Sequence, residues 1–238
     1  MSNFVRLGGA VAWTVDRLAA VLLPQHCFLC GEAGVAEPLC AQCRDLLPRL
    51  APPLCPICAA PTPGGQTCGA CLAHPPHFDA TLAPLRYGFP LDKLVQAFKY
   101  QHRLALAGVF ADRMLAGPLP DGDIVVALPL SLPRLRERGF NQAVELARPL
   151  ARRLGKPLWL DACTRPLERA VQATLPWQAR RKNVRGVFAC AADFTGRSVI
   201  VIDDVMTTGA TLDEFARTLK RAGAARVSNW VLARALKD

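Results

Sequence analysis

The stretch Val199-Ile-Val-Ile-Asp-Asp-Val-Met-Thr-Thr-Gly-Ala-Thr211 decides the fold of this chain. Its first four residues are apolar and β-branched, and a short run of this kind is typical of a buried strand in a parallel sheet. Such a strand delivers Asp203 and Asp204 to its carboxyl end, where open α/β sheets bind their ligands. The sequence therefore predicts an α/β fold with a ligand site at the end of this strand.

The segment after the two aspartates has the composition of a phosphate-binding loop. It leads into a helical pattern from Leu212 to about Ala222, so its backbone N–H groups and hydroxyls can surround a phosphate at a helix N-terminus. Two carboxylates beside that loop suit ribose hydroxyls and Mg²⁺. A doubly wound sheet with a solvated acidic pair is the alternative, but the full pattern is more specific than a glycine-rich turn. The residues expected in the loop are Thr207, Thr208, Gly209, Ala210 and Thr211.

This arrangement resembles the phosphoribosyl-pyrophosphate (PRPP) motif of type I phosphoribosyltransferases, and every position from Val199 to Thr211 fits that pattern. The resemblance implies a parallel sheet flanked by helices, with Asp203 and Asp204 as catalytic residues beside a loop that holds PRPP with Mg²⁺. Neither the P-loop pattern nor the dinucleotide-binding glycine fingerprint occurs in the chain. Sites for nucleoside triphosphates and NAD are therefore excluded.

Eight of the ten cysteines form four Cys-x2-Cys pairs at regular spacing. Because no export signal is evident, we expect thiolates in a reducing cytoplasm rather than a disulfide framework. Two such pairs present four thiolates to a tetrahedral ion, and the strict repeat favours two structural Zn²⁺ sites over an iron–sulfur cluster or redox thiols. Sequential and interleaved sharing of the pairs both satisfy the eight thiolates. The predicted ligands are Cys27, Cys30, Cys40, Cys43, Cys55, Cys58, Cys68 and Cys71.

Length and composition predict one main domain with a small appendage, because 238 residues that are about half apolar can bury a substantial core. We expect an N-terminal amphipathic helix over 1–24, a double zinc ribbon over 25–75 and a phosphoribosyltransferase-like domain over 80–238. The N-terminal helix is expected to cover another protein surface, and membrane-surface contact is the less favoured alternative. Cys163 and Cys190 lie outside the ribbons and are expected to be buried as small apolar residues.

Positive charge is concentrated after the ribbons. Residues 1–80 carry a net charge of −1 and residues 81–238 a net charge of +11. A ligand with many phosphates suits such a surface. The most basic part, 134–185, follows a second predicted strand at 124–128. If the two strands are neighbours, the loop at 129–139 faces the acidic pair, and a pyrophosphate would meet Arg134, Arg136 or Arg138.

Two further segments of this basic region carry structural predictions. A helix begins at Asn141 and Gln142 and continues to Leu154, and Pro149 inside it predicts a kink or a split into two shorter helices. The segment from Thr164 to Arg185 has weak periodicity and is predicted to be a long loop followed by a short basic helix. Loops of this length inside a compact domain are usually functional.

The whole chain resembles the ComF family of bacteria, in which a double zinc ribbon precedes a phosphoribosyltransferase domain. The marks that carry the resemblance are Phe98-Lys99-Tyr100, Arg138-Gly-Phe-Asn-Gln142, Arg165 with Gln172, the stretch Arg180 to Asn183, the cysteine module and the PRPP motif. The resemblance implies a cytoplasmic protein that assists incoming single-stranded DNA in natural transformation. The residues expected to contact pyrophosphate or nucleic acid are Lys99, Arg134, Arg136, Arg138, Arg165, Arg180, Arg181 and Lys182.

Three functional hypotheses follow from these patterns. The first is an active phosphoribosyltransferase that uses PRPP and Mg²⁺ to modify an unidentified acceptor with release of pyrophosphate. The second is a module that binds single-stranded DNA through its basic face and binds PRPP without turnover. The third makes the zinc ribbons a docking surface for a helicase or channel protein of DNA uptake.

Overall fold

A computed structural model describes residues 26–166 and 185–236. The chain forms two compact units, Met1–Leu47 and Pro48–Asp238. The predicted helix at 1–24 and the basic residues Arg180, Arg181 and Lys182 lie outside the described residues. Within the described part of the chain, no helix is long and apolar enough to cross a membrane.

The first unit is built around four cysteines. Cys27 begins a tight turn in which the Gly31 N–H donates to the Cys27 carbonyl, and Gly31 adopts a positive φ of 76°. The short helix α2 (Ala41–Asp45) starts directly after Cys40 and buries Cys43. In the second unit, α3 (Gly69–Ala73) repeats this arrangement after Cys68.

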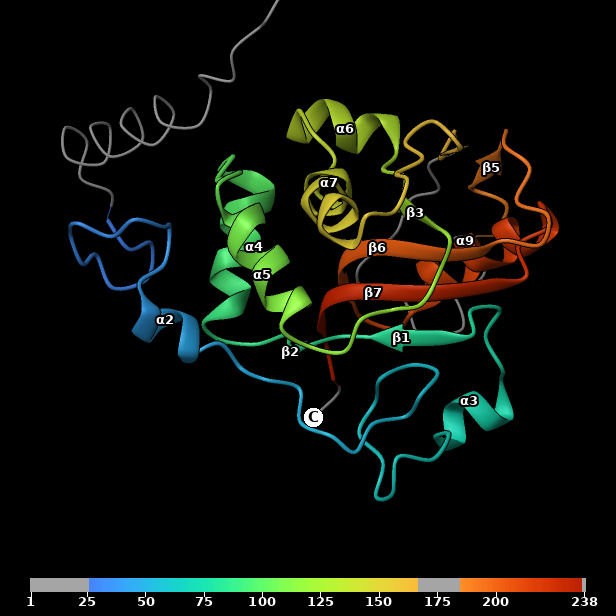
Figure 1. Ribbon diagram of the computed structural model, residues 1–238, viewed down its shortest axis with the longest axis horizontal. Coiled ribbons are helices and arrows are strands. Elements are labelled where there is room, and N and C mark those ends of the chain that lie inside the picture. Colours follow the sequence, from blue (N-terminus) through green and yellow to red (C-terminus); the bar gives the residue numbers. More distant parts are fainter. Residues whose placement is uncertain (1–25, 167–184, 237–238) are drawn as a thin grey trace, which may run out of the picture. The chain divides into compact units, whose positions relative to one another are not determined.

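The second unit contains a parallel sheet in which β7 and β6 are the central strands (Figure 1). The strand order is β1-β7-β6-β3, and β2 pairs with β7 beyond the end of β1. Val199 to Ile202 are fully buried, as the predicted strand requires. The prediction that the strands at 124–128 and 199–202 are neighbours is confirmed. Strand β3 pairs with β6 in parallel register, from Ile124↔Val199 to Ala127↔Ile202. The strands are β1 (Ala80–Leu82), β2 (Leu85–Arg86), β3 (Ile124–Ala127), β6 (Ser198–Met206) and β7 (Arg226–Arg234).

Helices cover both faces of this sheet (Figure 1). Helices α5 and α7 pack together on one face, and α9 lies on the other, as right-handed crossovers between parallel strands require. The apolar side of α9 buries Leu212, Phe215 and Leu219. The helices of this unit, besides α3, are α4 (Leu91–Tyr100), α5 (Leu106–Leu115), α6 (Leu132–Arg138), α7 (Gln142–Leu154) and α9 (Ala210–Arg221).

Strand β6 is longer than the sequence predicts. The sequence predicts that the two aspartates lie at the carboxyl end of the strand, but β6 continues to Met206, and Asp203 is paired with Val231 of β7. On the opposite side, β3 stops at Ala127, which is the partner of Ile202. The aspartates therefore lie within a strand, beyond the point where its other neighbour has ended, and one edge of β6 is open there.

Two other local predictions need correction. Helix α7 runs unbroken from Gln142 to Leu154 although Pro149 lies inside it, so the split into two shorter helices is wrong and the alternative, a kink, stays a prediction. Leu146, Ala147 and Leu150 are buried on one side of α7, and this packing offsets the loss of one backbone hydrogen bond at the proline. The segment 129–139 is not all loop, because residues 132–138 form α6.

A small antiparallel pair flanks the main sheet. Strand β4 (Cys163–Thr164) pairs with β5 (Ala189–Cys190), with Cys163 opposite Cys190 and Thr164 opposite Ala189. Cys163 is buried as predicted, whereas Cys190 is half-buried. Of the predicted loop and helix between Thr164 and Arg185, residues 167–184 lie outside the described part.

Candidate functional site: two cysteine clusters and a phosphate-type pocket

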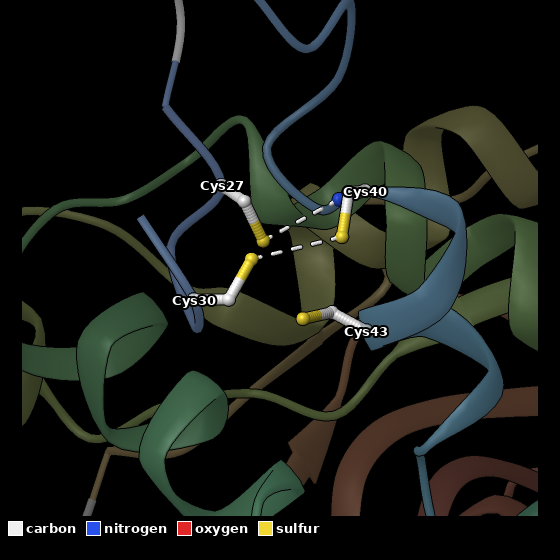
Figure 2. A group of neighbouring side chains, drawn as sticks. All are labelled: Cys27, Cys30, Cys40 and Cys43. Atoms are coloured by element: carbon white, nitrogen blue, oxygen red, sulfur yellow. Dashed lines mark hydrogen bonds between the residues drawn. The ribbon is translucent and has the colours of Figure 1, made fainter. Parts of the chain in front are cut away.

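The eight predicted zinc ligands gather into two groups of four. Within each group the four Sγ atoms all lie within 4.8 Å of one another, and Figure 2 shows them converging in the first group. Four thiolates at the usual zinc–sulfur distance of about 2.3 Å from one ion stand about 3.8 Å apart. Cys30 Sγ and Cys40 Sγ are 3.8 Å apart, and Cys58 Sγ and Cys68 Sγ are 3.6 Å apart. The spacing fits two closed Zn²⁺ sites with sequential sharing of the pairs.

Backbone N–H groups prepare these thiols for metal binding. The Cys40 N–H donates to Cys27 Sγ at 3.4 Å, and the Cys68 N–H donates to Cys55 Sγ at the same distance. Burial alone raises the pKa of Cys27, but several such donors outweigh it and lower this pKa to about 6. The same balance lowers the pKa of Cys55 to about 7. The two clusters thus have matching electrostatics as well as matching spacing.

A pocket of about 170 Å³ lies at the open edge of β6 in the second unit. It is bounded by the end of β3, the start of α7 and the N-terminus of α9. Every residue of the predicted phosphate loop lines it, together with both aspartates. The other polar residues of its lining are Lys99, Arg134, Arg138, Gln142 and Arg165.

The acidic pair faces a single lysine. Asp203 is buried, and Asp204 is more deeply buried, with 3% of its surface exposed. The ammonium of Lys99, from the last turn of α4, forms an ion pair with the Asp204 carboxylate. Burial opposes the charged form of Lys99, but attraction to Asp204 and Asp203 prevails and raises the Lys99 pKa. Burial, and then repulsion by Asp204, raise the pKa of Asp203 well above its usual value.

The loop after β6 turns sharply into α9. Gly209 caps the helix with a positive φ of 81°, and a Cβ at this position would lie 2.6 Å from Met206 Cε. The Ala210 N–H makes a long contact of 3.4 Å with the Thr208 hydroxyl. The turn leaves the first N–H groups of a 12-residue helix at the pocket. This is the backbone arrangement that binds phosphate groups.

Arg138 is held firmly on the opposite wall. Its guanidinium donates to the Gln142 side chain at 3.0 Å and to the Tyr100 hydroxyl at 3.1 Å, and it lies over the Tyr100 ring. Arg165 is also buried, with its guanidinium carbon 5.4 Å from the centre of the Phe188 ring. Arg134 is half-buried at the pocket. Arg136 is exposed and does not line the pocket.

Three supporting residues have no role assigned from the sequence, although Tyr100 and Gln142 lie in motifs that carry the family resemblance. Gln142 reaches the site because the turn between α6, which ends at Arg138, and α7, which begins at Gln142, brings the two side chains together. Tyr100 comes from a distant helix, so no local pattern indicates its contact. Arg234, at the end of β7, donates to the Cys58 carbonyl at 2.9 Å and to the Met206 carbonyl at 3.1 Å, and it also contacts the Thr207 carbonyl.

The chain matches known families over both of its parts. Residues 18–72 match the double zinc ribbon domain, and residues 141–238 match the phosphoribosyl transferase domain. The DNA utilization protein YhgH of Escherichia coli (strain K12) is 33% identical over 231 residues, which cover 90% of this chain and 99% of that protein. Competence protein F of Haemophilus influenzae is 32% identical over 226 residues, which cover 88% of this chain and 97% of that protein. The chain belongs to the ComF family.

Matches of this ComF-family protein to solved structures are weaker than its matches to these two relatives. One is the glutamine PRPP amidotransferase from B. subtilis, which was solved with ADP and GMP. It is 18% identical, with a TM-score of 0.41, and the match covers 57% of this chain and 30% of that one. Within the ComF-family chain, the pocket extends beyond the matched phosphoribosyl transferase segment, because Lys99, Arg134 and Arg138 precede residue 141.

Proposed function

We propose that this ComF-family protein binds PRPP together with Mg²⁺ in the pocket at the open edge of β6, and that it acts in DNA uptake. One observation carries the proposal. Two aspartates, a helix-capping loop and three arginines, which are widely separated in the sequence, line a single pocket. Phosphates, ribose hydroxyls and a cation are the groups that such a set recognises.

The acidic pair fits a magnesium ion. Two buried carboxylates, Asp203 and Asp204, face one ammonium, so the fully ionised pair retains negative charge. Mg²⁺ is usually held by one or two carboxylates together with the phosphates of a substrate. Bound Mg²⁺ would supply charge neutralisation for the pyrophosphate. We therefore propose Asp203 and Asp204 as the residues that hold it, with Lys99 orienting Asp204.

The phosphates of PRPP would divide between two walls. The loop Thr207 to Thr211 offers hydroxyls and N–H groups to the 5-phosphate of the ribose. The guanidinium groups of Arg134 and Arg138 would contact the pyrophosphate, and Arg138 is already oriented by Tyr100 and Gln142. A side chain that is fixed before binding loses less entropy when the ligand arrives, so its hydrogen bonds yield more affinity.

The DNA part of the proposal rests on charge and on relatives. Residues 81–238 carry a net charge of +11, and proteins named for DNA utilization and competence are similar over most of the chain. We infer binding of single-stranded DNA in the cytoplasm, with Arg180, Arg181 and Lys182 among the contacts. Exchange of these three residues for alanine should weaken binding and reduce the steepness of its salt dependence. An unchanged salt slope would count against them.

Calorimetric titration of the zinc-loaded protein with PRPP, with and without Mg²⁺, tests the pocket. We expect saturable binding that requires Mg²⁺ and is lost in the Asp203→Asn/Asp204→Asn double variant. Glu137→Gln is the matched control, because Glu137 is exposed on α6 and outside the pocket lining. Unchanged binding in the double variant would refute the assignment of the two aspartates.

The alternative is an active phosphoribosyltransferase. It is favoured by the same aspartates, which lie where they could stabilise positive charge on the ribose, and by arginines placed to neutralise a leaving pyrophosphate. The titration distinguishes binding from turnover when pyrophosphate release is followed in parallel with candidate acceptors. Release that depends on both Asp203 and an acceptor would establish turnover.

A further inference from the structure

Cys163 and Cys190 face each other across the β4–β5 pair. Their register is direct, because Cys163 of β4 stands opposite Cys190 of β5. Neither residue belongs to the zinc clusters of the described part, which draw on the other eight cysteines. The pair is therefore a second kind of cysteine site in the same molecule.

The backbone hydrogen bonds place Cys163 and Cys190 at a non-hydrogen-bonded position of the antiparallel pair. The Cα atoms of facing residues are closer there than at a hydrogen-bonded position. The Ala191 N–H donates to the Ala162 carbonyl at 2.9 Å, so the adjacent facing pair, Cys163 and Cys190, falls at a non-hydrogen-bonded position. In antiparallel strands such residues have Cα atoms about 4.5 Å apart. Disulfides span Cα distances of about 4.4–6.8 Å. Two thiols at this position can be joined with little movement of the backbone.

The two thiols also differ in exposure and in pKa, and both differences favour oxidation at one of them first. Cys163 is buried and Cys190 is half-buried, so a small oxidant reaches Cys190 first. A hydrogen bond from the Cys163 thiol, outweighing burial, lowers the pKa of Cys190. The same hydrogen bond, together with burial, raises the pKa of Cys163. Cys190 is thus the more acidic and the more accessible of the two thiols, and Cys163 is its neighbour.

We propose that Cys163 and Cys190 form a reversible disulfide when the protein meets a peroxide. The Cys190 thiolate attacks one peroxide oxygen, which gives a sulfenic acid and releases hydroxide. The Cys163 sulfur then attacks the sulfenic sulfur, its proton leaves, and water is released. In total, two thiols and one hydrogen peroxide give one disulfide and two waters. A small dithiol restores both cysteines by exchange.

A residue of the pocket directly follows this strand pair. Arg165 comes immediately after β4 and Phe188 immediately before β5, and Arg165 lies over the Phe188 ring. Phe188 contacts Phe215 of α9 at 4.9 Å between ring centres, and Arg165 lines the pocket. A bond between Cys163 and Cys190 would therefore fix the strand pair next to which Arg165 lies.

The consequence for ligand binding rests on the proposed PRPP site. Ordering one long side chain costs about 0.5–1.5 kcal/mol, so holding Arg165 in place before binding should tighten the affinity for PRPP with Mg²⁺ by about two- to tenfold. The structure thus assigns to the pair a redox control of the pocket, which the cysteines exert through Arg165.

The experiment exposes the zinc-loaded, full-length protein to low concentrations of hydrogen peroxide, blocks the remaining thiols by alkylation, and maps cross-linked peptides by mass spectrometry. We expect a Cys163–Cys190 cross-link at peroxide concentrations that leave both zinc ions bound, with complete reversal by dithiothreitol. Cys163→Ser should leave a sulfenic acid at Cys190 that a diketone probe traps. Cys190→Ser should leave Cys163 unmodified, because Cys163 is buried.

Calorimetry with PRPP and Mg²⁺ on the oxidised and reduced proteins tests the control of the pocket. The Cys163→Ala/Cys190→Ala variant should bind equally before and after peroxide. Loss of zinc before any cross-link appears would overturn the disulfide, and a cross-link with no change in the dissociation constant would overturn the coupling to Arg165. The cross-link is measured without PRPP, so it tests the disulfide independently of the pocket. If neither the oxidised nor the reduced protein binds PRPP, the proposed function is wrong, and the disulfide is still decided by the cross-link.

Discussion

Burial of Asp203 beside a second carboxylate raises its pKa well above the ordinary value for an aspartate. The unfolded chain releases this proton at an ordinary pKa, whereas the folded chain retains it. Stability therefore falls as the pH rises from the unfolded pKa of about 3.9 towards the raised folded value. The ammonium of Lys99 forms its ion pair with Asp204, and the charge of Asp204 adds repulsion to the burial of Asp203. The position is unfavourable for the fold and well suited to a bound cation.

Asp203→Asn should accordingly stabilise the unliganded protein while it weakens Mg²⁺ binding. We expect its melting temperature to exceed that of the wild type by a margin that grows as the pH is raised above the ordinary pKa of an aspartate, about 3.9, without Mg²⁺ or PRPP. Asp121→Asn is the control, because Asp121 is exposed and the change should have little effect. A wild type that is more stable than the variant at pH 8.0 would refute the assignment.

Gly209 supports a second prediction at this scale. An alanine there must adopt a left-handed backbone, which costs about 1–2 kcal/mol, and its Cβ would clash with Met206. We expect Gly209→Ala to lower the free energy of unfolding in urea by at least this amount and to weaken PRPP binding. Gly108→Ala, at an open position of α5, should raise stability by about 0.5–1 kcal/mol. Equal effects of the two changes would contradict this account of the loop.

At the scale of elements, local sequence patterns predict individual strands and helices but not the contacts between elements that are distant in the chain. The apolar runs at 124–128 and 199–202 predict β3 and the buried part of β6, and the loop chemistry predicts the start of α9. The extension of β6 to Met206 is not visible, because aspartates disfavour strands and the extension depends on pairing with β7. The contact between Arg138 and Tyr100 escapes prediction for a related reason, since it joins two helices that are distant in the chain.

Strand β7 ends in a residue that connects two other elements. Arg234 donates to carbonyls of Cys58, in the second ribbon, and of Met206, at the end of β6. Its removal leaves partly buried carbonyl groups without these donors, and each such group costs about 1–3 kcal/mol. Arg234 thereby links the second cysteine cluster to the start of the predicted phosphate-binding loop.

We expect Arg234→Ala to lower the free energy of unfolding by about 2 kcal/mol or more in urea titrations and to weaken PRPP binding through a less ordered loop. Arg226→Ala is a matched control on the same strand, because Arg226 is exposed at its start. If the two variants unfolded at the same urea concentration, the stabilising link that Arg234 makes between the second cysteine cluster and the end of β6 would be refuted.

At the scale of the whole molecule, two clusters with the same spacing have different surroundings. The first belongs to the unit Met1–Leu47, and the second belongs to the unit that contains the sheet. The second is joined to that sheet by Arg234 and by a hydrogen bond of 3.4 Å from the Thr81 N–H to the Pro56 carbonyl. A structural zinc contributes directly to the folding free energy of the segment that it organises. Loss of the second ion should therefore affect the sheet and pocket, whereas loss of the first should not.

Cys43→Ser and Cys71→Ser form a matched pair for this prediction. Both residues are buried, each lies in the short helix that follows the third cysteine of its cluster, and each change removes one zinc ligand. We expect Cys71→Ser to lower the melting temperature of the sheet-containing unit by roughly 5–10 °C, a shift that corresponds to a loss of about 3 kcal/mol. PRPP affinity should fall in this variant. Cys43→Ser should lose one zinc equivalent and keep both the main unfolding transition and PRPP binding. Equal losses in the two variants, measured by calorimetry and zinc analysis, would mean that both ribbons stabilise the pocket.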